Sequence, residues 1–382
     1  MINIVLLSFL WVAFEYKILS GIPGLEIFSI PINLLAYSQY QNTNLIQLVS
    51  VIGTIGLEFC IVLVNILFCR IFFNKLIDKI NYNPRSTDYR FKNMISASVI
   101  VSVFICLFSF SLTQSKNYGE MVSYGVIQGN LSGKEIRGKD LNPLDVFKRH
   151  AILSEEITER NDIVIWPEGS VASTKRFWVD KKSAALINEL HTLIFGTYFG
   201  DEQSRTFNSI QILNKSGEEI LSKFYHKRHL VPFGEYTPFI WILPENLKLL
   251  AQSVVGEGFS SGPKNQEAVE TPYGKVGFTV CFELLFPEMI RQEVLSGAEY
   301  LINLNDLSWF KGDMVKKQFL AVGVMRAIEN RRDLILAGNV GYSAHIDSLG
   351  NIKEISQPSR KGSLEGVITT NDKVSIFSRY GW

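Results

Sequence analysis

Apolar residues are spread unevenly along the chain and concentrate in its first third. Residues 49–69 and 95–112 are almost continuously apolar, close to the roughly 20 residues that a helix needs to cross a bilayer. A shorter run, residues 2–14, becomes long enough to cross when residues 16–19 are added. The pattern therefore predicts a membrane region at residues 1–113 with about three transmembrane segments.

Three details qualify this membrane region. The first run has no basic segment and no small-residue cleavage site, so it does not match a signal peptide. Residues 22–40 are apolar but broken by Pro23 and Pro31, which suits a re-entrant or interfacial segment. Glu58 lies in mid-span, where a carboxylate must face protein or water. A lipid or substrate path and a hydrogen bond to a neighbouring helix explain Glu58 equally well.

From residue 122 the pattern changes to short β-rich runs alternating with helical stretches, which predicts an α/β or mixed layered domain. Strands are predicted at residues 122–128, 162–166, 191–197, 209–214, 275–280, 300–305, 334–339 and 343–347. Helices are predicted at residues 145–160, 180–189, 287–296 and 316–330.

The segment at residues 70–93 predicts the orientation of the chain in the membrane. It carries six basic residues against two acidic ones, and short basic loops stay in the cytoplasm. The next span then leads outward, so the domain at residues 114–382 is expected outside the cytoplasm. In a bacterium this is the periplasmic side of the inner membrane.

Composition reduces the number of functions that the chain can have. The net charge of +1 gives no support to nucleic-acid binding, and neither a Gly-rich phosphate loop nor a paired CxxC or HExxH is present. Of four cysteines only Cys281 lies in the soluble part, so that part has no internal disulfide. A lone thiol is either a small buried hydrophobe or a nucleophile.

Three motifs place reactive side chains where predicted strands end. In Ile163-Val-Ile-Trp-Pro-Glu168 a carboxylate follows a strand too apolar to face water, and desolvation raises a carboxyl pKa towards that of a useful base. A turn-capping role is the alternative for Glu168. Lys227 lies in a cationic cluster that continues into Leu-Val-Pro-Phe-Gly-Glu235, where it stabilises an oxyanion or lies on a solvated basic face.

The third motif, Val276-Gly-Phe-Thr-Val-Cys281-Phe-Glu283, ends an apolar strand in a thiol. Phe282 then begins a turn towards the helix at residues 287–296. A thiol near a helix N-terminus is favoured as thiolate, and backbone N–H groups there can receive an oxyanion. Together the motifs supply the base, cation and thiol that nucleophilic acyl transfer needs.

At these residues the sequence resembles the carbon–nitrogen hydrolase (nitrilase) superfamily, and within it the apolipoprotein N-acyltransferases. The motifs that carry the resemblance are Trp166-Pro-Glu168, Tyr225-x-Lys227-x-His229-Leu-Val-Pro-Phe-Gly-Glu235, Cys281-x-Glu283, Phe207-Asn208-Ser209, Asn305-Asp306-x-x-Trp309-Phe310, Arg326-Ala-x-Glu329-Asn and Asn339-x-Gly341-x-Ser343. Phe282 and Phe207 stand where the family often has Tyr. The family also has further membrane helices before and after the matching segments.

The resemblance implies an αββα sandwich with a Glu168–Lys227–Cys281 triad at the strand ends. Glu168 would take the thiol proton, and Lys227 with the backbone N–H of Phe282 would stabilise the oxyanion. Glu235 and Glu283 would be supporting carboxylates. The resemblance also suggests Asn208, Trp309, Trp241 and Phe239 as substrate-binding residues, with the apolar residues 236–250 acting as a lid that dips to the interface. Plain core packing explains that apolar stretch equally well.

The implied reaction moves a fatty acyl chain from a phospholipid, through a Cys281 thioester, to the amino group of diacylglyceryl-cysteine in an apolipoprotein. The partners are the phospholipid donor, the diacylated apolipoprotein and the membrane, with the chain acting as a monomer and needing no metal or organic cofactor. One rival keeps the triad but passes the acyl group to water, as a membrane-tethered amidase. A second rival is a non-enzymatic lipoprotein-binding scaffold.

Overall fold

Two six-stranded sheets form the centre of the protein, in a computed structural model that describes residues 2–20, 31–32, 34–80, 108–109, 119–136, 142–171, 192–216, 219–242, 244–249 and 258–381. The strand order is β12-β1-β2-β3-β4-β5 in one sheet and β11-β10-β9-β8-β7-β6 in the other. In each sheet three central strands run parallel: β1–β2–β3 and β7–β8–β9. The carboxyl ends of these strands can therefore gather side chains at one edge.

The strands of the first sheet are β1 (Met121–Gln128), β2 (Ile163–Val171), β3 (Thr192–Gly200), β4 (Thr206–Ser216), β5 (Glu219–His226) and β12 (Gly362–Thr369). Those of the second are β6 (Val269–Thr271), β7 (Gly274–Val280), β8 (Tyr300–Asn305), β9 (Leu334–Gly338), β10 (Ala344–Ile346) and β11 (Ile352–Ile355). The helices are α1 (Ile2–Ser20), α2 (Val49–Ile80), α4 (Gly133–Ile136), α5 (Pro143–Glu155), α8 (Pro287–Leu295), α9 (Met314–Asn330) and α10 (Ile376–Tyr380). Short 3-10 turns are η2 (Leu35–Gln39), η3 (Leu45–Leu48), η4 (Thr158–Arg160), η5 (Ile240–Ile242) and η6 (Cys281–Leu285).

Three apolar layers hold these elements together. β-branched and aromatic residues from both sheets, such as Ile165 and Phe278, interdigitate in one core between the sheets. A second core lies between the β6–β11 sheet and α8 and α9, and a third packs α5 onto β2 through Phe147 and Trp166. Helix, sheet, sheet and helix thus follow one another, which confirms the expected αββα sandwich.

All eight predicted strands are present, whereas the sequence missed β5, β6, β11 and β12. β5 carries Glu219, Lys223 and His226, and β11 has three exposed residues out of four. β12 pairs only with β1, at the border of its sheet. Edge strands need no apolar alternation because one or both faces meet solvent, so their sequence signal is weak. The predicted helix at residues 180–189 lies outside the described residues.

Helix α2 is the one described helix that is long and apolar enough to cross a membrane, over Leu45–Arg70 with its preceding turn. α1 contains a shorter apolar stretch, Ile4–Glu15. The predicted span at residues 95–112 lies outside the described residues except for residues 108–109. The predicted loop at residues 70–93 needs a correction, because α2 continues through Ile80, so the basic segment starts on a helix.

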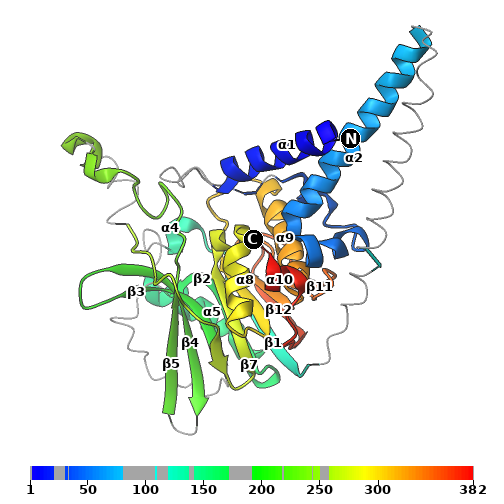
Figure 1. Ribbon diagram of the computed structural model, residues 1–382. Coiled ribbons are helices and arrows are strands. Elements are labelled where there is room, and N and C mark those ends of the chain that lie inside the picture. The colour runs from blue at the N-terminus through cyan, green and yellow to red at the C-terminus, as the bar shows by residue number, and fades with distance from the viewer. Residues whose placement is uncertain are drawn as a thin grey trace.

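The N-terminal end of α2 is docked on the soluble domain. α2 is kinked at Gly53 (φ 70°), where the ring of Phe377 lies so close that a Cβ atom would meet it at 2.6 Å. Thr54 donates from its backbone N and its Oγ1 to the buried Glu329 carboxylate on α9, at 2.8 and 2.7 Å. Beyond the kink α2 runs away from the sheets, while its lower part lies beside α9 and α10 (Figure 1). Ala36 and Tyr37 of the Pro-broken stretch pack here too, and the N–H of Ala36 donates to Glu58. Glu58 also lines a pocket together with Val12 and Leu285, so both interpretations of this carboxylate remain open.

Candidate active site

Glu168 lies near the carboxyl end of β2, at an irregularity in the pairing between β2 and β3. The register shifts between Trp166 and Val171, and Gly169 adopts a positive φ of 71°. Gly196 on β3 makes room for this bulge, because a Cβ atom there would lie 2.5 Å from the Glu168 Cα. The sequence placed Glu168 at the tip of a strand; the structure places it on the bulge, with the carboxylate turned into the domain.

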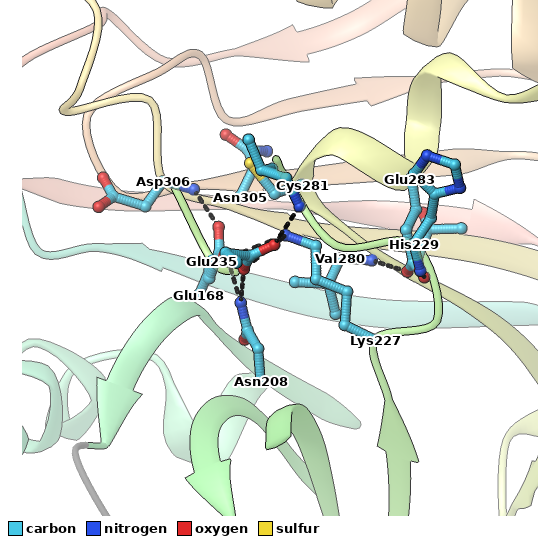
Figure 2. A network of polar contacts seen from close by, with 12 residues as sticks. Glu168, Asn208, Lys227, His229, Glu235, Val280, Cys281, Glu283, Asn305 and Asp306 are labelled. Carbon is cyan, nitrogen blue, oxygen red and sulfur yellow. Dashed lines mark hydrogen bonds and ion pairs between the residues drawn. The ribbon is translucent and has the colours of Figure 1, made fainter. Parts of the chain in front are cut away.

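Both oxygens of the Glu168 carboxylate are held by neutral donors. Asn208 Nδ2 donates to Oε1 at 2.7 Å, and the backbone N–H of Asp306 donates to Oε2 at 2.8 Å. The same Asn208 amide donates to Glu235 Oε1 at 2.7 Å, so one side chain bridges the carboxylates of Glu168 and Glu235. Asn208 was expected to bind substrate, but its amide nitrogen is occupied by these two carboxylates. Figure 2 shows this group converging on the end of the Lys227 side chain.

Lys227 follows β5 and is 1 % exposed. Its Nζ lies 2.8 Å from Glu235 and 3.7 Å from Glu168 Oε1. Burying an ammonium costs several kcal/mol unless it is paired, and removing one partner of a buried pair costs about 3–5 kcal/mol. Glu235 in turn accepts the backbone N–H of Val231 at 2.8 Å, which closes the Leu-Val-Pro-Phe-Gly segment into a tight turn. The solvated-face alternative for Lys227 is therefore wrong.

Cys281 directly follows β7 and has a φ of +49°, a left-handed conformation that is uncommon for a residue with a Cβ atom. The 3-10 turn η6 begins at this residue, and α8 begins at Pro287. The predicted strand–turn–helix elbow is present, but η6 separates the thiol from the α8 N-terminus. In Figure 2, Cys281 lies above the end of the Lys227 side chain, beside Asn305.

Electrostatics favour a neutral thiol at rest. Burial, and then the Glu168 carboxylate, raise the pKa of Cys281 well above its ordinary range. The sequence had suggested a thiolate favoured by a helix N-terminus; desolvation outweighs that effect. Burial also raises the pKa of Glu168 to about 7, with Lys227 opposing the rise. Burial alone would lower the pKa of Lys227, but Glu235 and Glu168 outweigh it and hold the ammonium charged.

Glu283 does not touch Lys227 and acts on the backbone instead. Its Oε1 accepts the N–H groups of Arg228 (2.7 Å) and His229 (3.1 Å), and its Oε2 accepts that of Val280 (2.8 Å). It therefore ties the segment after the lysine to the residue before the thiol. The His229 ring packs 4.0 Å from the Phe286 ring, and burial lowers its pKa to about 4, so it remains neutral.

The remaining predicted site residues lie outside the hydrogen-bonded cluster of Glu168, Lys227 and Glu235. Phe282 is the second residue of η6 and packs edge-on against Phe286. Trp309 is 55 % exposed in the loop that follows Asp306. Phe239 is also exposed, and the side chain of Trp241 lies outside the described residues. Ile242, Leu247 and Leu249 in the same stretch are exposed too, so plain core packing does not explain residues 236–250.

The sequence missed the second partner of Glu168. The backbone N–H of Asp306 reaches Glu168, and Asn339 holds the Asp306 side chain through Nδ2 at 3.0 Å. Asn339 also exchanges two hydrogen bonds with the backbone of Leu131. The polar residue directly after each of β8 and β9, Asp306 and Asn339, was the available signal, since strand ends at one edge bring such residues together.

The assembled groups are those of acyl transfer. A buried carboxylate with a pKa of about 7 lies beside a charged ammonium and next to a neutral thiol. Such a carboxylate can take the thiol proton, and the ammonium can stabilise the negative charge that develops on a carbonyl oxygen. The arrangement suits attack on an ester or amide carbonyl.

Comparison with protein families gives two matches. Residues 125–371 match the carbon–nitrogen hydrolase family, and residues 1–67 match the N-terminal domain of apolipoprotein N-acyltransferase. The two matches follow one another along the chain, so its N-terminal part and its C-terminal part both have counterparts.

Curated relatives agree with both matches. The chain is 30 % identical to the apolipoprotein N-acyltransferase of Geobacter metallireducens, covering 98 % of this chain and 70 % of that protein. It is 25 % identical to the Haemophilus ducreyi enzyme, covering 88 % and 65 %. It therefore spans about two thirds of its relatives' length. Among solved structures, the NitFhit protein of C. elegans superposes with a TM-score of 0.50 at 19 % identity, covering 66 % of this chain and 62 % of that one, which supports the fold alone.

Proposed function

This chain belongs to the apolipoprotein N-acyltransferase family of carbon–nitrogen hydrolases, and we propose that it moves a fatty acyl chain from a phospholipid, through a thioester on Cys281, to the N-terminal amino group of diacylglyceryl-cysteine in an apolipoprotein. The observation that carries the residue assignment is the buried cluster of Glu168, Lys227 and Glu235 beside Cys281. Glu168, Cys281 and the Lys227–Glu235 segment come from three different parts of the chain, and the fold brings them to one edge of the two sheets.

The first half-reaction forms the acyl-enzyme. Glu168 accepts the thiol proton as Sγ of Cys281 attacks the ester carbonyl carbon. The oxyanion lies between the Lys227 ammonium and the backbone N–H of Phe282. When the tetrahedral intermediate collapses, the ester C–O bond breaks, and the lysophospholipid leaves as an alcohol with the proton from Glu168.

The second half-reaction transfers the acyl group. The uncharged amino group of the lipoprotein cysteine attacks the thioester carbonyl, and Glu168 takes a proton from the nitrogen. The C–S bond then breaks, an amide forms, and the thiol is restored with that proton. Splitting one difficult step into two easier ones is the advantage of a covalent intermediate.

The expected location of both substrates in the membrane agrees with the proposed acyl transfer. Both substrates are lipids, and α2 offers an apolar helix of membrane-spanning length docked on the catalytic domain. The exposed Ile242 and Leu249 belong to an arm, residues 236–249, that continues directly from Glu235. An apolar arm next to the site can enter the interfacial layer and guide an acyl chain inward. We place the chain in a bacterial inner membrane as a multi-pass monomer, with the catalytic domain on the periplasmic side.

The test is transfer to a defined acceptor. The membrane-embedded protein is incubated with phospholipid and a diacylated lipopeptide, and the lipopeptide is analysed by mass spectrometry. The proposal expects a mass gain of one acyl chain on the N-terminal amine and one lysophospholipid per transfer. Free fatty acid with unmodified lipopeptide would instead support the hydrolase with water as acceptor. No reaction by a folded protein would favour the scaffold.

A further inference from the structure

A second set of buried polar groups lies behind the site, on the side of α8. Arg228, the residue after the catalytic lysine, donates from Nη2 to Glu293 Oε1 at 2.6 Å, and both side chains are nearly inaccessible. Arg228 Nε also donates to the Tyr225 hydroxyl at 3.2 Å, and its guanidinium lies over the Tyr225 ring. The Tyr225 hydroxyl donates to Glu283 Oε2 at 2.9 Å. Four side chains thus form one continuous path, here called the α8 network: Glu293, Arg228, Tyr225 and Glu283.

The two ends of the α8 network differ in what they touch. One end is Glu293 on α8, whose main chain packs so closely on β7 that a Cβ atom on Gly277 would lie 2.8 Å from the Glu293 Cβ. The other end is the Glu283 carboxylate, which accepts the backbone N–H groups on either side of the site. Glu283 and His229 are both labelled in Figure 2. The lysine belongs to the end of β5 and the thiol to the end of β7, in different sheets, so the network spans the seam between them.

We propose that Arg228 and Glu293 are positioning residues for acyl transfer, an inference that rests on the proposed function. Their buried ion pair, acting through Tyr225 and Glu283, fixes the distance between the catalytic ammonium and the thiol. Neither residue reaches the reacting atoms. The pair matters because the lysine and the thiol have no shared element, and a misplacement of about 1 Å can cost about a hundredfold in rate.

A positioning role and a merely stabilising role predict different behaviour. A buried ion pair often contributes little net stability, whereas removing one partner leaves an unpaired buried charge. Arg228→Gln and Glu293→Gln alone should therefore both lower Tm. The double substitution leaves two neutral amides that can hydrogen-bond each other, so Tm should return towards the wild-type value. An amide at position 228 cannot reach both Glu293 and Tyr225, so the link to Glu283 stays broken.

The experiment measures the three variants in membrane-embedded, full-length protein. Single-turnover acylation by labelled phospholipid should slow about tenfold to a hundredfold in all three, including the double variant whose Tm has recovered. The apparent KM for phospholipid should stay within about twofold, because the binding surface is untouched. Ile368→Val, in the core between the sheets on β12, is the control that lowers Tm without touching the α8 network. It should acylate at the wild-type rate.

A second readout separates this inference from the proposed function. Alkylation of Cys281 by iodoacetamide, mapped by peptide mass spectrometry, needs no acyl donor. In the double variant its pH profile should move to higher pH, because the ammonium no longer stabilises the thiolate at the same distance. If the wild type transfers no acyl group but this shift is seen, the proposed function fails and the positioning role stands. A double variant with wild-type acylation and an unshifted alkylation profile would overturn the positioning role.

Discussion

At the scale of single residues, the reactive groups depend on partners that lie far from them in the sequence. Glu168 and Cys281 lie near the ends of two predicted apolar strands, and strand ends at one edge meet, whereas Lys227 follows β5, which the sequence missed. The sequence did not reveal which groups hydrogen-bond to each charged side chain. Asn208 spaces two carboxylates and the Asp306 backbone holds Glu168, contacts between residues far apart in sequence. The thiol was expected as a thiolate, yet burial raises its pKa, because desolvation depends on packing that no local motif reveals.

Glu168 gives the first prediction, because a base must be deprotonated to act. Burial raises its pKa to about 7, so protonation should suppress acylation below that pH by about tenfold per pH unit, with a plateau above it. Single-turnover acylation measured as a function of pH checks this. Glu168→Gln keeps the hydrogen bond from Asp306 and should slow acylation about 10²–10⁴-fold at all pH values. A Gln variant within about threefold of wild type, or an acid limb near the ordinary glutamate pKa of about 4.3, contradicts the assignment.

At the scale of elements, the strands and helices that could be predicted are those whose apolar residues recur with a clear period. Every predicted strand and the helices α5, α8 and α9 are present, because each buries an apolar face in one of the three cores. The polar edge strands β5, β6, β11 and β12 were missed. The kink at Gly53 and the docking of α2 on α9 were also missed, since they depend on Phe377 and Glu329 from the other end of the chain.

The exposed arm at residues 236–249 gives the second prediction. Ile242→Ser with Leu249→Ser should raise the apparent KM for bilayer phospholipid several-fold, because each removes apolar area that would enter the interface. The rate with a short-chain ester dissolved in detergent should be unchanged. Ile152→Ser, which is equally exposed on α5, is the matched control and should act as wild type. Equal effects of both changes, or none from the arm, would argue for a role unrelated to lipid.

At the scale of the whole molecule, composition predicted a division into a membrane part and a catalytic part. The order of strands and helices predicted the fold class, and the two family matches, residues 1–67 and 125–371, lie on either side of the predicted boundary. The joint between the parts was not foreseeable. It combines an apolar core, which Tyr37 and Leu57 share with residues of α9, with buried polar contacts. Arg331 Nη1 donates to Gln47 Oε1 at 2.6 Å, and Glu329 holds Thr54. Such contacts join residues that are far apart in the sequence, so they can be recognised only in the folded structure.

Topology gives the third prediction. The six basic residues at residues 70–93 predict that this segment lies in the cytoplasm and that the catalytic domain lies outside it. A reporter that is active only outside the cytoplasm, fused after Thr113, should be active. The same reporter fused within residues 81–93 should be silent. The reverse result would place the catalytic domain in the cytoplasm, away from the lipoprotein amino termini that the proposed function requires.

The central claim is that Cys281 carries the acyl chain, and the most direct measurement is the mass of the protein between the two half-reactions. Wild-type protein incubated with labelled phospholipid should gain one acyl chain at Cys281 through a hydroxylamine-sensitive bond, and lose it to added diacylated lipopeptide. Cys281→Ser should remain unlabelled or keep the acyl group without turnover, because a hydroxyl has a far higher pKa and forms a more stable ester. Cys281→Ala protein that still acylates the lipopeptide would contradict the covalent mechanism.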